Sequence, residues 1–450
     1  MITRAAIEER VREWSLREDV VEKDYVLGWL LWGISIDEQL GKTWVFKGGT
    51  CLKKCYFETY RFSEDLDFTI LPGGPARAED MQPALLRLLA RVQETSGIQL
   101  DERPPLLRTH ESGRHTEGRV YYRGPRGAPQ VASVKLDLSA SEQVVRPPVL
   151  RPIGHAFPDE LPEPAQVPCY SFEEVFAEKI RAMGERCRPR DLYDIIHLYR
   201  RSDLRRQPQL IREVLHEKCR SKGVSVPTMA AMESMPYREE IEIAWENMLA
   251  HQLPSLPEFA TFWAELAGLF VWLETAQAVA VLPVAPTHEP IEEGWMPPAT
   301  AHTWGESVPI EAVRFAAANR LCVNLGYKGT VREIEPYALR RSKAGPLLLV
   351  AIKRTVRQPR TYRVDRIESI SVTRKPFIPV YEIEIGAGEL HAPPLMRTRT
   401  TAAYGPPYVF ECPLCGKLFK RSSYDSKLRP HKDRSGWDCS GRAGCFVGND

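Results

Sequence analysis

The stretch "VFKGGTCLKKCYFETYRFSEDLDFTI", residues 45–70, decides the fold. It opens with apolar residues typical of a β-strand, turns at Gly48 and Gly49, and ends in a second strand-like segment with acids at Asp65 and Asp67. Because side chains two positions apart on a strand leave the same face, the two carboxylates are predicted to lie side by side, with apolar residues on the opposite face.

Two neighbouring carboxylates can hold a divalent cation. Mg²⁺, or Mn²⁺ in its place, suits such a site because it binds a few carboxylates together with phosphate oxygens. A third acid is expected on a later strand, "QVASVKLDLSAS", where Asp137 shares a face with Lys135. The predicted ligands of this metal are Asp65, Asp67 and Asp137.

The glycine pair adds a second kind of chemistry. Glycines let the backbone approach a phosphate closely, and a hydroxyl or an ammonium group nearby strengthens such a site. The predicted nucleotide-binding residues are Lys47, Gly48, Gly49, Thr50 and Ser63. The alternative is a tight turn followed by a solvated edge strand, and it is the weaker hypothesis because glycines and acids occur together in this order.

Length and composition limit the possible classes. A chain of 450 residues with 43% hydrophobic and 27% charged residues is typical of a globular protein with two to four domains. Its longest uncharged apolar run, "YVLGWLLWGISI", is shorter than the roughly 20 residues that a membrane-spanning helix needs. The N-terminus lacks the apolar core of a signal peptide, so we expect a cytoplasmic protein without a membrane partner.

The pattern along the chain predicts an α+β protein of several domains. Helical and strand-like patterns alternate over residues 1–275, and Ser171 and Glu174 form a capping box that should start a helix. Residues 276–306, rich in Pro and Ala, are expected to be a linker. A strand-rich domain over residues 307–400 and a cysteine-containing finger over residues 404–450 should follow.

A second pair of motifs follows the capping box. In "EKIRAMGER", Lys179 lies near the apolar stripe of its helix and should pair with an anion, unless it snorkels to solvent. In "RPRDLYDIIHLY", Asp191 and Asp194 follow Pro189 in the first turn of the next helix, where the helix dipole favours acids even without a function.

The order of these motifs resembles the polymerase-beta-like nucleotidyltransferases. The segments "VEKDYVLGWLL", "FKGGTCLKK" and "RFSEDLDF" look more closely like the AbiEii/AbiGii toxins of abortive-infection and type IV toxin-antitoxin systems. The resemblance covers about residues 15–275, and one departure is the longer spacer of fifteen residues between Gly49 and Asp65.

The resemblance implies a nucleotidyltransferase domain with a helical C-terminal part. It makes Asp65, Asp67, Lys179 and Asp191 catalytic, with Arg190 and Asp194 as supports. The implied reaction is metal-dependent transfer of a nucleoside monophosphate from an NTP to an acceptor hydroxyl. The 3′ end of tRNA is the first choice and a protein hydroxyl the second. A cognate antitoxin is the implied partner in an anti-phage or abortive-infection system. The alternative is a non-catalytic, nucleic-acid-binding regulator with a degenerate transferase fold.

The C-terminal segment contains a Cys-Pro-x-Cys-Gly knuckle. This turn aims two thiolates at one point, and later ligands can complete a closed tetrahedral zinc site. The predicted zinc ligands are Cys412, Cys415, His431 and Cys439, with Cys445 able to replace either late ligand. The alternative, reduced and unliganded cysteines, is disfavoured because so short a tail has few apolar residues to fold without metal.

Between linker and finger, "VNLGY", "EPYAL" and "YRVDRI" resemble the WYL domain, a small SH3-like β-barrel, although "LLLVAIKR" replaces the Trp-Tyr-Leu triplet. The region from residue 340 to residue 375 carries eleven Lys and Arg against two acids. The resemblance implies nucleic-acid or nucleotide sensing, and the candidate contacts are Tyr327, Tyr337, Arg363 and Arg366. The alternative is a solvated basic face in which Asp365 pairs with an arginine.

Overall fold

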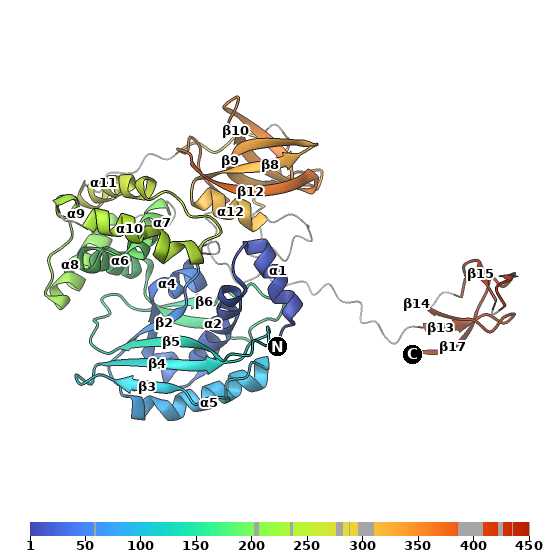
Figure 1. Cartoon of the computed structure of the whole chain (residues 1–450), viewed down its shortest axis with the longest axis horizontal. Helices are drawn as coiled ribbons and strands as arrows, with labels where there is room; N and C mark the ends of the chain where they lie inside the picture. The colour runs from blue at the N-terminus through green and yellow to red at the C-terminus, as the bar shows by residue number, and fades with distance from the viewer. Residues whose placement is uncertain are drawn as a thin grey trace. The chain divides into compact units, whose positions relative to one another are not determined.

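The computed structural model describes residues 1–57, 60–201, 207–234, 237–275, 282–287, 289–295, 310–385, 408–421, 426–433 and 435–449. Most of the predicted linker, residues 276–306, lies outside these ranges, as do residues 386–400 and 404–407 of the two predicted domains that follow it. The chain forms two compact units, Met1–Ala392 and Pro393–Asp450 (Figure 1). The finer division of the first unit stays a prediction.

A mixed seven-stranded sheet forms the centre of the N-terminal half. Its order is β3-β4-β5-β2-β1-β7-β6, and β2 runs parallel to β5 and antiparallel to β1. The strands are β1 (Trp44–Lys47), β2 (Asp65–Ile70), β3 (Leu106–Thr109), β4 (His115–Tyr122), β5 (Ala132–Ser139), β6 (Val149–Pro152) and β7 (Gln166–Cys169). The three strands predicted from the alternating patterns are β1, β2 and β5.

The helices that precede or interrupt this sheet are α1 (Arg4–Trp14), α2 (Glu18–Ile36), α3 (Leu40–Thr43), α4 (Gly48–Cys51), the π-helix η1 (Leu52–Tyr56) and α5 (Ala78–Ser96). Helix α2 is apolar around most of its circumference and is buried from Val20 to Ile34 with one exception, Lys23. A β-carbon at Gly33 would lie 2.5 Å from Cγ2 of Val92 in α5, so this glycine permits close helix packing. Among the described residues, no helix has both the length and the apolar character required to cross a membrane.

A helical layer follows the sheet in the chain: α6 (Phe172–Arg186), α7 (Pro189–Arg200), α8 (Pro208–Lys222), α9 (Met229–Ser234), α10 (Tyr237–Leu249), η2 (Ala250–Gln252) and α11 (Phe259–Thr275). Helix α6 begins where predicted, because the hydroxyl of Ser171 accepts from the backbone N–H of Glu174. The Glu174 carboxylate, however, accepts from two backbone N–H groups and pairs with Lys218 at 2.7 Å, so it does not complete the predicted capping box. Asp194 lies one turn beyond Asp191, outside the first turn in which it was predicted.

The last part of the first unit is a small β domain. Helix α12 (Ile310–Ala318) leads into the strands β8 (Leu321–Tyr327), β9 (Thr330–Arg341), β10 (Leu347–Lys353), β11 (Gln358–Arg363) and β12 (Ile367–Pro376), with the short helix η4 (Val364–Arg366) before β12. The sheet is antiparallel throughout, in the order β11-β10-β9-β8-β12. The strand predicted from "PVYEIEIG" does not form in the described residues 379–385, whose backbone instead bonds to neighbouring segments.

Helix α12 joins this β domain to the helical layer. The hydroxyl of Tyr193 in α7 donates to the side-chain oxygen of Asn319 at 2.9 Å, and Arg200 donates to the carbonyl of Ala318 at 3.0 Å. A buried Asn with paired donors and acceptors fixes one arrangement of the packed elements. The β domain is therefore docked on α7, the helix that carries Asp191 and Asp194.

The second unit is a small β structure with few apolar residues. A three-stranded sheet in the order β14-β13-β17 lies with a two-stranded hairpin formed by β15 and β16. The strands are β13 (Tyr408–Glu411), β14 (Leu418–Arg421), β15 (His431–Lys432), β16 (Asp438–Cys439) and β17 (Cys445–Asn449). Its buried core consists of Phe410, Cys412, Leu428 and Cys439, so two of its four core members are cysteines.

Candidate active site

The predicted acids and the predicted lysine lie in one row across adjoining strands. Lys47 at the end of β1 is directly opposite Asp67 of β2, and Asp67 is directly opposite Asp137 of β5. Residues that are directly opposite on neighbouring strands project from the same face of the sheet. Asp65 lies two positions before Asp67 and shares that face. The sheet therefore gathers the three predicted carboxylates and the predicted ammonium group on one face.

The two glycines are explained by how closely the acids and their supports approach the turn. Gly48 has φ +81°, and a β-carbon there would lie 2.2 Å from Oδ2 of Asp67. A β-carbon at Gly49 would lie 2.4 Å from the Arg61 guanidinium and 3.1 Å from the Ser63 hydroxyl. The glycine pair thus brings the turn, Asp67 and Ser63 together.

Thr50 attaches this turn to the acidic strand. Its buried hydroxyl donates a hydrogen bond to the backbone carbonyl of Asp65. That bond fixes the start of β2 relative to the glycine pair. The five predicted nucleotide-binding residues are therefore close together, and their role in binding phosphate stays a prediction.

The electrostatics of the row favour a bound cation. Burial, together with the carboxylates of Asp137 and Asp65, raises the pKa of Asp67 to about 6, against the opposing effect of Lys47 and Lys179. Burial also raises the pKa of Asp65. A cation placed among these oxygens would relieve the repulsion between them, so the donor set fits a hard divalent ion.

Asp137 has its own partners at the outer side of the row. Its carboxylate lies 3.6 Å from the ammonium of Lys135 and 3.8 Å from Nδ1 of His115 on β4. Glu117 is directly opposite Asp137 on that strand and lies 3.5 Å from Lys135. Sequence reasoning missed His115 and Glu117 because only strand pairing brings β4 to the acids.

Lys47 is already paired with a carboxylate. Its ammonium forms an ion pair with Glu142, which follows β5, and the hydroxyl groups of Thr69 and Tyr170 lie 3.4 Å from the same carboxylate. Burial disfavours the charge on Lys47, but Glu142, Glu178 and Asp67 outweigh it and raise the pKa of Lys47. Glu142 was missed by sequence reasoning, since nothing local to "SASEQ" indicates that it reaches β1.

The helical layer contributes a buried ionic hub at Asp194. Its carboxylate accepts two hydrogen bonds from Arg61, at 2.7 and 2.8 Å, and a third from the hydroxyl of Tyr60. Lys179 of α6 lies 2.7 Å from the same carboxylate and 3.5 Å from that of Asp191. Lys179 thus pairs with an anion, as predicted, and does not snorkel to solvent.

Asp191 and Arg190 complete the inner side of the site. Asp191 accepts from the guanidinium of Arg186 at 2.8 and 2.9 Å. Burial lowers the pKa of Arg190, with Arg61 lowering it further and Asp65 opposing the shift. Since Lys179 and Arg186 also interact electrostatically with Asp67, the motifs of α6 and α7 lie within reach of the acidic row.

The basic residues of the spacer serve different partners. Lys54 is buried and pairs with Asp24 of α2 at 2.8 Å, so it belongs to the core. The ammonium of Lys53 lies 4.7 Å from the centre of the Phe62 ring and 5.6 Å from that of Trp14. Arg61 is bound to Asp194. Each of the three basic residues, Lys53, Lys54 and Arg61, therefore has a partner within the protein.

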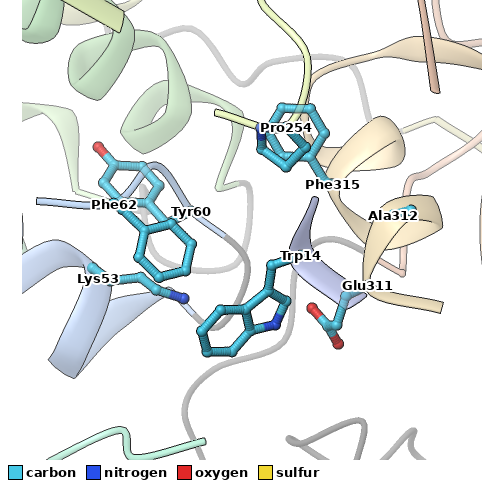
Figure 2. Close-up of a pocket in the computed structure, with 8 residues that line it drawn as sticks. All are labelled: Trp14, Lys53, Tyr60, Phe62, Pro254, Glu311, Ala312 and Phe315. Carbon is cyan, nitrogen blue, oxygen red and sulfur yellow. The ribbon is translucent and has the colours of Figure 1, made fainter. Parts of the chain in front are cut away.

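Lys53 also lines a small pocket between α1, the spacer and α12, shown in Figure 2. The lining residues are Trp14, Lys53, Tyr60, Phe62, Pro254, Glu311, Ala312 and Phe315. Its cavity volume is about 20 Å³, enough for a single water molecule and far below that of a nucleotide pocket. A cavity of this size does not hold a nucleotide.

The residues predicted to contact nucleic acid in the β domain differ in accessibility. Arg366 is exposed, whereas Arg363 pairs with Asp365 at 2.6 Å, as the solvated-face alternative anticipated. Tyr327 is 8% exposed, and Tyr337 is fully buried against Phe377 and Tyr381. Tyr337 is therefore a core residue, and its predicted contact with nucleic acid is wrong on grounds of burial.

The second unit brings its predicted ligands together. The ligand atoms of Cys412, Cys415, His431 and Cys439 all lie within 4.8 Å of one another and could hold a metal ion. Nδ1 of His431 donates to the Arg429 carbonyl at 2.9 Å, which leaves Nε2 for a metal.

Three further features of the second unit bear on this group. Burial raises the pKa of Cys412, but the backbone amides of Leu414 and Cys415 outweigh it and lower that pKa to about 6. A β-carbon at Gly441 would lie 2.4 Å from Sγ of Cys412, so the chain approaches the thiols closely there. Cys445 is exposed on β17 and does not belong to the group.

A mixed sheet that presents clustered acids beside a glycine turn, joined to a helical layer, defines a nucleotidyltransferase fold. The family model described as nucleotidyl transferase AbiEii toxin, type IV TA system, matches residues 29–266, more than half of the chain. The chain therefore belongs to the AbiEii family of nucleotidyltransferase toxins. The family model of the WYL domain matches residues 310–372, which contain α12, the strands β8 to β11 and the first part of β12.

Comparison with solved structures gives distant likenesses. MenT4, a nucleotidyltransferase toxin from Mycobacterium tuberculosis H37Rv, is 21% identical, with 62% of this chain and 91% of that chain covered and a TM-score of 0.42. Proteasome accessory factor B/C of Arthrobacter aurescens is 18% identical, with 62% of this chain and 41% of that chain covered and a TM-score of 0.15. A comparison with curated proteins gives no match. The assignment rests on the two family models.

Proposed function

We propose that the chain transfers a nucleoside monophosphate from an NTP to an acceptor hydroxyl, in a reaction that requires Mg²⁺ or Mn²⁺. The observation that carries the proposal is the in-register row of Lys47, Asp67 and Asp137 beside the close glycine turn. Asp65, Asp67 and Asp137 would hold the metal, which when bound neutralises phosphate charge and lowers the pKa of the attacking hydroxyl.

The protein's own groups would bind and orient the triphosphate. Backbone amides at Gly48 and Gly49, together with Ser63, would hold its oxygens at the turn. Lys47 would offset the charge of the leaving pyrophosphate, exchanging its bond to Glu142 for one to phosphate. The cationic side chains of α6 and α7 would add positive potential from the helical layer. Lys179 and Asp191 would be the catalytic pair.

For the acceptor we propose the 3′ end of tRNA. A type IV toxin acts with a cognate antitoxin, which would be this protein's partner, and the exposed Arg366 of the basic β domain would contact the nucleic acid. The paired Arg363 would contact it only after leaving Asp365. A protein hydroxyl is the second acceptor to examine.

The test is label transfer from each α-labelled NTP into total tRNA, with wild type and Asp65→Ala compared in Mg²⁺. Transfer by the wild type alone is expected. No transfer by the wild type, with Asp65→Ala indistinguishable from it, would overturn the proposal. The alternative is a non-catalytic, nucleic-acid-binding regulator. It would be supported if the protein bound nucleic acid in a salt-sensitive way but showed no Mg²⁺-dependent affinity for NTP.

We also propose that the four ligands of the second unit hold a structural zinc ion. The full-length protein should contain about one zinc per chain, and Cys439→Ser should remove it. Residues 408–449 should then become sensitive to protease, because two of the four core residues of this unit are metal ligands. Zinc is measured by elemental analysis.

Cys445→Ser is the matched control, since Cys445 is exposed and lies outside the ligand group. It should keep the zinc. Equal zinc contents in the two variants would contradict the assignment of Cys439.

A further inference from the structure

A second group of cysteines lies directly after the glycine turn. The sulfur atoms of Cys51, Cys55 and Cys169 all lie within 4.8 Å of one another, and each residue is 0% exposed. Cys51 ends α4, Cys55 belongs to the π-helix η1, and Cys169 ends β7. These three residues, called here the three-thiol cluster, belong to the first unit and are separate from the zinc ligands of the tail.

The spacing of the thiols suits one small soft cation. Two ligands four residues apart lie on one side of a helical turn, and the third comes from a neighbouring strand. With metal–sulfur bonds of about 2.3 Å, three thiolates around one ion have sulfur–sulfur distances of about 4 Å. The three sulfurs lie within 4.8 Å of one another, so only a small adjustment would bring them to that distance.

Cys169 lies among polar groups of the protein. Its sulfur is 3.9 Å from the hydroxyl of Tyr56 and 3.5 Å from the backbone carbonyl of Val149. The packed chain thus holds the three sulfurs close together before any ion binds.

A fixed cation lies beside the cluster. The Arg151 side chain donates to the carbonyl of Cys55 at 3.1 Å, and its guanidinium carbon lies 4.6 Å from the centre of the Tyr56 ring. A guanidinium at this position offsets the negative charge that three thiolates around a monovalent ion would carry. The hydroxyl of Tyr56 itself donates to the backbone carbonyl of Tyr170, so the ring is held in place.

We propose that the three-thiol cluster is a binding site for a thiophilic monovalent cation, of which Cu⁺ is the representative. Soft thiolate ligands select such ions over Mg²⁺, and a site with three sulfurs and no carboxylate excludes hard cations. On binding, the three thiols release their protons to water, and the resulting thiolates coordinate the ion with no change in oxidation state.

Binding would link the glycine turn to the sheet. The ion would join β7 to the helical segment that begins at Gly48, so the segment that bears the turn would open less readily. This consequence for stability does not depend on nucleotidyl transfer. It makes thermal stability a readout that stands apart from activity.

The test uses the chain with Cys412→Ser, Cys415→Ser, Cys439→Ser and Cys445→Ser, which removes the competing thiols of the tail. This parent is titrated with Cu⁺ under anaerobic conditions against a chromophoric Cu⁺ chelator. Binding of one Cu⁺, an ultraviolet thiolate-to-copper absorption band and a rise in melting temperature are expected. Adding Cys51→Ala or Cys169→Ala should lower the Cu⁺ affinity at least tenfold and abolish the rise.

Cys322→Ala in the same parent is the matched control, because Cys322 is equally buried but lies in the β domain, away from the cluster. It should bind Cu⁺ as the parent does. Circular dichroism of each variant without copper establishes that it is folded, and Cys55→Ala replaces any variant that is not. No binding by the parent, equal binding by the Cys51 and Cys322 variants, or a mass 2 Da lower from a disulfide among the three would overturn the proposal.

Discussion

Replacing Asp67 with asparagine is expected to reduce nucleotidyl transfer on the order of 10³-fold while leaving the metal-free protein as stable as the wild type. The substitution keeps the shape that packs against Gly48 but removes the charge at the centre of the acidic row. Stability should not fall, because burial and neighbouring carboxylates already disfavour the charged form of Asp67. Transfer is measured with labelled NTP in Mg²⁺, and stability by urea denaturation in a chelator.

Asp101→Asn is the control for this substitution, since Asp101 is an exposed acid outside the strands that carry the site. It should leave both quantities unchanged. If Asp67→Asn kept wild-type transfer, the acidic row would not be the metal site. A large loss of stability in the chelator would mean that Asp67 is structural.

The alternating pattern of the acidic strand was enough to predict which face Asp65 and Asp67 share. That pattern depends only on the period of a strand, so local sequence determines it. The register that places Asp67 between Lys47 and Asp137 depends on pairing between segments far apart in the chain. The sequence was therefore enough to predict which face of the sheet the acids share. The residues opposite them on neighbouring strands could be identified only from the structure.

The same limit explains the partners that sequence reasoning missed. Glu142 and Arg61 have no periodic signal of their own, yet each is the partner of a predicted residue, Lys47 and Asp194 respectively. Tyr337 is an error of the opposite kind, since a contact was predicted that the structure does not allow. The local sequence does not distinguish an aromatic residue that contacts nucleic acid from one that fills the core. Long-range packing decides such cases, and it placed Tyr337 inside.

The buried hub at Asp194 leads to the second large expected effect, which is on stability. Burial opposes the charge of Asp194, but Arg61 and Lys179 outweigh it and hold its pKa well below the ordinary value. Asp194→Asn would leave Arg61, whose side chain is 2% exposed, without its counter-charge. Breaking a buried pair by removing one partner costs about 3–5 kcal/mol, so a loss of this size in the free energy of unfolding is expected.

Asp191→Asn is the matched comparison, because it makes the same chemical change three residues away on α7. Its main partner, Arg186, has a side chain that is 46% exposed and can recover hydration, so the loss should be about 2 kcal/mol smaller. Urea denaturation followed by tryptophan fluorescence measures both variants. Equal losses would contradict the view that burial of the partner sets the cost.

The pH dependence supplies an independent check on Asp194. Because its pKa is lower in the folded than in the unfolded protein, its stabilising contribution is complete above the unfolded value of about 4 and is lost as the pH falls further. The difference in stability between wild type and Asp194→Asn should stay constant from about pH 7 to 5 and narrow only below about pH 4. A difference that narrowed already between pH 7 and 6 would show that Asp194 is not held as a carboxylate by Arg61 and Lys179, and the hub would need another explanation.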